Sequence, residues 1–81
     1  MQLIFSKSTD KFIKRANLKL KHRMLEAIKG IFNNPPLGDI KPMTGIKGEY
    51  RLRVGKYRVI FEFHDDILKI LDIDSRGDIY K

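Results

Sequence analysis

One stretch, Gly48 to Phe63, constrains the fold of this chain more than any other. Its sequence is GEYRLRVGKYRVIFEF. Two runs rich in β-branched and aromatic residues flank Gly55-Lys56, and glycine at the first position of a two-residue turn is typical of a type II′ hairpin. Because such a turn fixes the register of the two strands, Arg53 is predicted to face Arg58.

Side-chain alternation along the two strands sorts the hairpin into an apolar face and a polar face. The expected core face carries Tyr50, Leu52, Val54, Tyr57, Val59, Phe61 and Phe63. The outward face carries Glu49, Arg51, Arg53, Arg58, Ile60 and Glu62. Directly opposed arginines destabilise a sheet, so Arg58→Ala is expected to leave stability unchanged or slightly raised. Phosphate would suit this cluster, since it matches the guanidinium fork. A solvated strand face with arginines protecting an edge fits equally well.

The positive charge of the chain is concentrated in its first third. The sequence has 81 residues, which predicts a single domain over residues 1–81, and its net charge is +7. Residues 7–29 hold eight basic and two acidic side chains, whereas residues 30–81 hold nine and eight. Such a patch suggests nucleic acid, an acidic protein or an anionic membrane surface as partner. The residues predicted to bind RNA or a ribosome are Lys14, Arg15, Lys19, Lys21, Arg23, Lys29 and Lys56.

Several classes of protein are disfavoured by what the sequence lacks. It has no cysteine, no apolar run near the ~20 residues of a membrane span and no secretory signal at its start. A cytoplasmic protein without membrane contact is therefore expected. His22 and His64 lack metal-ligand spacing, and no phosphate loop, nucleophile elbow or catalytic triad pattern occurs. Neither a metal nor a cofactor is expected.

The remaining segments predict a two-layer α+β domain in the order β-α-α-β-β-β, with two helices on one face of an antiparallel sheet. They are a strand at 2–5, a helix capped by Ser6 or Ser8 and stopping near Asn17, a second helix at about 18–32, a loop at 37–47 and a last strand at 67–73.

The last strand is expected to follow a two-residue turn at Asp65-Asp66. That register places Leu68 and Ile70 on the core face. It leaves an apolar strip on the outward face, made of Ile60, Ile67, Leu71 and Ile73. An exposed apolar strip beside concentrated charge is typical of a surface that a partner covers.

The outward arginines suit phosphodiester cleavage of RNA, in which the substrate's own 2′-OH attacks phosphorus. The protein then supplies a base, cations for the phosphorane charge and an acid for the departing 5′-oxygen. Glu49 is a candidate base or simply an ion-pair partner of the arginines. Tyr80 can stack on a nucleobase or donate to the phosphate, and packing of its ring at the chain end is the alternative. Arg76 can join the three hairpin arginines.

The pattern YRLRVGKYRVIFEF, followed by an acidic turn, an apolar strand and a terminal SRGDIY, resembles the RelE/ParE superfamily of bacterial type II toxins over essentially the whole chain. The resemblance implies a toxin neutralised by an antitoxin protein, whose complex binds operator DNA through the antitoxin. In the RelE branch it implies a ribosome-dependent endoribonuclease that cuts mRNA in the decoding site. Carried onto this chain, the catalytic residues of that branch are Arg51, Arg53, Arg58, Arg76 and Tyr80.

The chain departs from the ribonuclease pattern near its end. Asp74-Ser75-Arg76 stands where many ribonuclease members carry Gly-His-Arg, which removes one acid/base candidate. The ParE branch has the same fold, lacks the nuclease constellation and poisons DNA gyrase. The retained arginines and Tyr80 favour the RelE branch, while a gyrase inhibitor and an inactive toxin-fold binding protein remain the alternatives.

Overall fold

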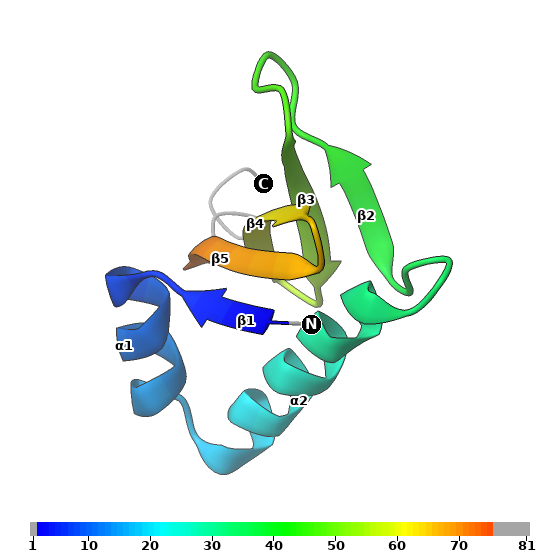
Figure 1. Ribbon diagram of the computed structural model, residues 1–81. Coiled ribbons are helices and arrows are strands. Elements are labelled where there is room, and N and C mark those ends of the chain that lie inside the picture. Colours follow the sequence, from blue (N-terminus) through cyan, green and yellow to red (C-terminus); the bar gives the residue numbers. More distant parts are fainter. Residues whose placement is uncertain (1, 76–81) are drawn as a thin grey trace.

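The computed structural model describes residues 2–75, so the predicted site residues Arg76 and Tyr80 lie outside the described part (Figure 1). Its elements, in chain order, are β1 (Gln2–Phe5), α1 (Lys7–Arg15), α2 (Leu18–Lys29), the 3₁₀ helix η1 (Gly30–Phe32), β2 (Asp39–Pro42), β3 (Glu49–Val54), β4 (Tyr57–His64) and β5 (Ile67–Asp74).

The described strands form one sheet in the order β1-β5-β4-β3-β2. The helices lie together on one side of this sheet (Figure 1), which confirms the predicted two-layer α+β domain. The sheet is mixed rather than antiparallel, because β1 runs parallel to β5. A tight turn sets the direction of β4 against β3, but both helices and the three other strands separate β1 from its neighbour β5 in the sequence. No local signal in the sequence fixes its direction.

The segment predicted as a loop at 37–47 contains a strand. β2 pairs antiparallel with β3 and places Ile40 opposite Leu52. It is a short edge strand ending in Pro42 and carrying exposed Lys41. Proline and lysine are residues that protect an edge from further pairing. Because neither residue is typical of a strand interior, the sequence did not predict a strand here.

The central hairpin has the predicted register. Arg53 faces Arg58, and Arg51 lies opposite Ile60. Gly55 has a φ of +59°, as the first turn position requires. At the other end of β4, Asp65 and Asp66 have φ values of 52° and 61°, and two positive φ angles are typical of a type I′ turn.

A β-bulge between β4 and β5 makes the prediction for Ile73 wrong. Ile60 pairs with Asp72 and Phe61 pairs with Ile70, so Leu71 is an extra residue on β5. An extra residue reverses the alternation beyond it, and Ile73 turns to the core with 7% exposure. Ile60 on the outward face is only 8% exposed. The exposed apolar strip is therefore smaller than predicted.

The start of α1 satisfies the backbone of the bulge. The Ser6 hydroxyl donates to the Leu71 carbonyl at 3.0 Å, and the Ser6 amide donates to the Ile70 carbonyl at 3.0 Å. The Ser6 hydroxyl also accepts the Thr9 amide at 3.3 Å as the N-cap of α1. Thr9 is fully buried and donates either to the Ser6 carbonyl at 3.0 Å or to the Ile70 carbonyl at 3.3 Å. Ser6, not Ser8, is thus the cap, and it ties α1 to the sheet.

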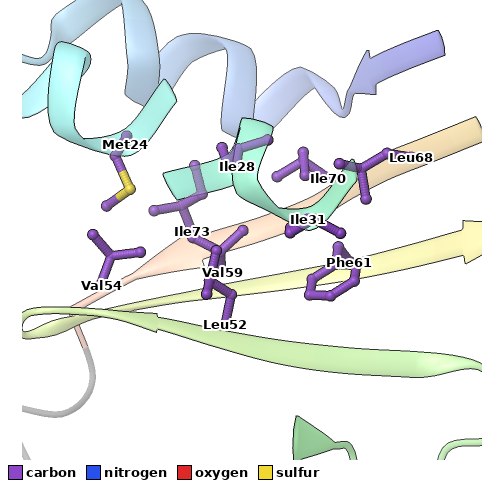
Figure 2. Close-up of a cluster of buried hydrophobic side chains, with 10 residues drawn as sticks. All are labelled: Met24, Ile28, Ile31, Leu52, Val54, Val59, Phe61, Leu68, Ile70 and Ile73. Atoms are coloured by element: carbon purple, nitrogen blue, oxygen red, sulfur yellow. The ribbon is translucent and has the colours of Figure 1, made fainter. Parts of the chain in front are cut away.

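The core lies between α2 and the inner face of the sheet (Figure 2). Its buried members are Met24, Ile28, Ile31, Leu52, Val54, Val59, Phe61, Leu68, Ile70 and Ile73. The predicted second helix is confirmed up to Lys29, after which Gly30–Phe32 tightens into a 3₁₀ turn. The ring of Phe12 meets Tyr57 edge to face, and Phe32 meets Phe63 in the same way. The end of α1 therefore lies at the hairpin tip, and the end of α2 lies at the opposite end of β4. Within residues 2–75, no helix is long and apolar enough to span a membrane.

Candidate nucleic-acid interface

The sheet surface turned away from the helices carries the predicted arginines. We call it the arginine face, and on the central hairpin it consists of Glu49, Arg51, Arg53, Arg58, Ile60 and Glu62. Val59 and Phe61, which alternate with Arg58 and Ile60, belong to the core instead. The predicted placement of all three hairpin arginines on one face is therefore confirmed.

Aspartates from both neighbouring strands flank the arginines, and the sequence argument missed them. Asp39 on β2 lies opposite Arg53, and its carboxylate is 3.6 Å from Nη2 of Arg51. Asp74 on β5 lies opposite Arg58, with its carboxylate 3.7 Å from Nε. Asp39 lay in a predicted loop, and the bulge was needed to bring Asp74 level with Arg58. Only the strand register reveals these neighbours.

The arginine face is balanced in charge over the described residues. Register places five basic side chains on it, namely Lys41, Arg51, Arg53, Arg58 and Lys69. It also places five acidic ones, namely Asp39, Glu49, Glu62, Asp72 and Asp74. The two signs are unevenly spread, since the arginines gather toward the hairpin tip while Glu49 and Glu62 face each other at the far end. With their strand partners Asp39 and Asp74, Arg53 and Arg58 form a neutral row at the tip, whereas the row of Glu49, Glu62 and Lys69 at the far end is net acidic.

Two guanidinium groups keep donors that no acceptor among residues 2–75 satisfies. Nη1 of Arg51 and Nε of Arg58 are buried without a hydrogen-bond partner. The two side chains are only 14% and 26% exposed. Their contacts with Asp39 and Asp74, at 3.6 and 3.7 Å, are ion pairs longer than hydrogen bonds. Unsatisfied buried donors are costly in proteins.

The acidic candidate Glu49 lies on the arginine face as predicted, at its far end. It pairs with Glu62, and Arg53 lies four positions further along the strand, a distance of about 13 Å. Glu49 is therefore a neighbour of Arg51 rather than of the Arg53–Arg58 pair. No three His, Cys, Asp or Glu side chains among residues 2–75 are grouped to hold a metal ion.

The residues predicted to bind RNA or a ribosome lie on the helix layer, on the other side of the sheet, apart from Lys56 in the hairpin turn. Lys14 forms an ion pair with Asp10 at 3.0 Å, and Lys29 forms one with Glu26 at 3.4 Å. These are the two acidic residues of that layer. The predicted binding residues of the helices are thus separated from the arginine face, and the charges of two of them, Lys14 and Lys29, are neutralised by ion pairs.

A groove of about 550 Å³ opens between α1, the start of α2 and the hairpin tip. Its floor is apolar, formed by Phe12, Leu20, Tyr57 and neighbouring side chains. Lys11 and Arg15 stand at its rim. An apolar floor with a basic rim suits an amphipathic segment with acidic flanks.

Comparison with solved structures gives the same fold. A chain of the RelB–RelE antitoxin–toxin complex from Methanococcus jannaschii is 28% identical, with coverage of 95% of this chain and 94% of that chain and a TM-score of 0.73. A chain of the archaeal RelE–RelB complex from Pyrococcus horikoshii OT3 is 27% identical, with 94% coverage of both chains and a TM-score of 0.74. The YoeB dimer from Staphylococcus aureus, 21% identical with 89% and 92% coverage and a TM-score of 0.74, shares the fold.

A search of curated proteins found no match. The family model described as ParE toxin of type II toxin–antitoxin system, parDE, matches residues 3–80. That match covers nearly the whole chain, and it agrees with the toxin–antitoxin complexes among the structural neighbours. The chain therefore belongs to the ParE toxin family, within the RelE/ParE superfamily, and is a toxin of a type II toxin–antitoxin system.

Proposed function

We propose that this toxin is a ribosome-dependent endoribonuclease that cuts mRNA through attack of the 2′-OH on the adjacent phosphate. One observation carries the proposal: Arg51, Arg53 and Arg58 share one face, and two of their guanidinium groups keep an N–H donor without an acceptor in the described part of the chain. Donors that are already in place act on charge that develops in the transition state.

The chemistry divides among few groups. A base takes the proton of the 2′-OH, the 2′-oxygen bonds to phosphorus, and the bond from phosphorus to the 5′-oxygen breaks as that oxygen gains a proton. The arginines stabilise the negative charge on the phosphorane oxygens. Glu49 is the candidate base beside Arg51, and Arg76 and Tyr80 are expected to complete the site. No cofactor takes part in this scheme.

The test uses ribosomes stalled with an empty decoding site on a 5′-labelled mRNA. Wild type should release a labelled fragment, and Arg58→Ala should release far less. Lys47→Ala is a matched control, because Lys47 is an exposed cation in the loop before β3, away from the hairpin turn. An intact mRNA with wild-type protein would refute the ribonuclease proposal.

A second candidate is inhibition of DNA gyrase, which the name of the matching family favours. The pairing of Arg51 and Arg58 with aspartates also fits a face that does not act on phosphate. If wild type arrests growth without cutting mRNA, a supercoiling assay with purified gyrase decides. Blocked supercoiling supports this candidate, and unaffected gyrase leaves an inactive toxin-fold binding protein.

The proposed protein partner is a cognate antitoxin, acting with the toxin in the cytoplasm and carrying any operator DNA contact. Chains of similar structure occur in toxin–antitoxin complexes. An acidic amphipathic helix of the antitoxin is proposed to bind in the groove whose floor is formed by Phe12, Leu20 and Tyr57. Amide exchange in the complex should slow in α1 and at the start of α2. Protection confined to β2 would contradict this seat.

A further inference from the structure

The arginine face and the main positive charge of the toxin lie on opposite layers. Five basic and five acidic side chains balance on the arginine face of residues 2–75. Residues 7–29, which form the helix layer, hold eight basic and two acidic ones. A polyanion is attracted at long range by net charge. RNA is therefore drawn to the helix layer, and it reaches the arginines only where the two surfaces meet.

The two layers meet at the hairpin tip through Arg23 and Gly55. A Cβ atom built on Gly55 would lie 2.8 Å from Nη2 and 3.1 Å from Cζ of Arg23. The guanidinium of Arg23, which comes from α2, therefore lies directly against the turn that joins β3 to β4. The φ of +59° favours glycine at this position, whereas the close approach involves only the far end of the flexible Arg23 side chain.

Two cations of α2 extend from this contact along the helix. Lys19 precedes Arg23 by one helical turn, so both project from the same side of α2, and both are exposed. The acidic residues of the layer, Asp10 and Glu26, pair with Lys14 and Lys29. Within residues 2–75 neither Lys19 nor Arg23 forms an ion pair.

On the sheet side of the hairpin tip, further basic side chains follow Lys19 and Arg23. Lys56 occupies the turn, with its Nζ 5.9 Å from the centre of the Tyr57 ring. Arg53 is exposed and lies opposite Arg58 on the arginine face. At the far end of β3 and β4 the face is net acidic, because Glu49 faces Glu62 there and Lys69 is the one basic neighbour that the register gives them among the described residues. The tip is therefore the end over which a phosphate chain can pass.

We propose that an RNA strand held on the arginine face crosses the hairpin tip and continues along the first half of α2, in contact with Lys56, Arg23 and Lys19. This path rests on the proposed ribonuclease function and defines the RNA contacts outside the cleavage site. It places Lys14 and Lys29, which are ion-paired, off the path of the strand.

Fluorescence anisotropy with a labelled single-stranded RNA oligonucleotide, repeated over a series of KCl concentrations, tests the path. Arg23→Gln and Lys56→Gln should each weaken binding and reduce the slope of log K against log salt by about 0.7, the share of one phosphate contact on a single strand. Lys47→Gln removes the same charge from the loop before Glu49, at the end of β3 opposite to Lys56. It should leave the slope unchanged. Arg23→Lys keeps the charge and should keep the slope.

The outcomes separate this path from the function on which it rests. If Lys47→Gln lowers the slope as much as Lys56→Gln, charge at any position suffices and the path is wrong, while RNA binding stands. If wild type binds no RNA oligonucleotide yet cuts mRNA on ribosomes, the path is wrong and the ribonuclease function stands. If it neither binds nor cuts, both are overturned. Melting temperatures equal to wild type ensure that lost binding is not lost folding.

Discussion

Arg53 and Arg58 lie directly opposite each other on β3 and β4, and an aspartate stands on the outer side of each. Asp39 faces Arg53 and Asp74 faces Arg58. Cross-strand pairs of opposite charge contribute about 0.2–1 kcal/mol each, and like pairs cost free energy. The aspartates therefore offset the repulsion between the arginines without any bound anion. Under the proposed function, an RNA phosphate would therefore have to compete with these carboxylates for the same guanidinium groups.

Asp39→Asn should tighten RNA binding. The change removes the carboxylate 3.6 Å from Arg51 and leaves the arginine face with a net positive charge. Asp39 is 52% exposed, so the ion pair is screened and its loss should lower the free energy of unfolding by at most about 1 kcal/mol. RNA anisotropy at fixed salt, with thermal melting alongside, measures both effects.

Asp66→Asn is the matched control for Asp39→Asn. It removes one carboxylate from the turn at the acidic end of the arginine face, and asparagine tolerates the φ of 61° found there. Its affinity for RNA should change less than that of Asp39→Asn. Equal gains for the two variants would mean that net charge, and not competition at Arg51, controls binding.

Arg58→Ala should lower the rate of mRNA cleavage by about 100-fold, the usual effect of losing one group that stabilises transition-state charge. The opposed arginines alone predict unchanged or slightly raised stability. The ion pair with Asp74 reverses the expected sign of the stability change, since the variant loses the attraction to Asp74 at 3.7 Å as well as the repulsion from Arg53. A loss of about 0.5–1 kcal/mol in the free energy of unfolding is expected. Urea denaturation and ribosomal cleavage measure the two quantities separately, and a stabilised variant would show that the Asp74 pair contributes nothing.

Local signals were sufficient wherever a short turn joins two elements. The Gly55-Lys56 turn fixed the register of β3 and β4, and with it the face on which Arg53 and Arg58 lie. The helices were also predictable, since Ser6 caps the first, Asn17 marks the break between the two, and apolar spacing marks the buried side. These features depend on interactions within a few residues, which a single sequence displays.

Features that depend on distant partners were missed. The bulge at Leu71 reversed the orientation of Ile73, and the sequence gives no sign of it because the stabilising hydrogen bond comes from Ser6. The parallel pairing of β1 and the edge strand β2 likewise depend on tertiary contacts. As a result, the aspartates beside the arginines could not be foreseen. The roles of Arg76 and Tyr80 remain predictions.

Ser6→Ala should destabilise the toxin by about 1–2 kcal/mol, because it removes both a helix cap and a hydrogen bond to the bulge. The hydroxyl accepts the Thr9 amide at 3.3 Å and donates to the Leu71 carbonyl at 3.0 Å. Ser8→Ala is the control, since Ser8 is exposed within the first turn of α1. Its cost should stay within about 0.5 kcal/mol. Equal costs in urea denaturation would contradict the link between α1 and the bulge.

Gly38→Ala should destabilise the toxin and loosen β2. Gly38 has a φ of +113°, and a Cβ atom there would lie 2.7 Å from Cδ1 of Leu52. Leu52 is 1% exposed and packed in the core, so it cannot move aside without strain. Overpacking of a core typically costs about 1–3 kcal/mol. Gly48→Ala is the matched control, because its φ of +86° is also positive but nothing lies within 4 Å of the added atom.

The same substitution also tests the role of the neighbouring Asp39. If β2 loosens, Asp39 moves away from Arg51 and RNA binding should tighten, as in Asp39→Asn, although the fold is weakened. Amide exchange should quicken in β2, at Ile40 and Lys41, before it does in β4. Gly48→Ala should affect RNA binding less, since the loop before β3 holds none of the arginine contacts. If both glycine variants lose the same stability, the positive φ explains the cost, and the close packing of Gly38 on Leu52 has no part in it.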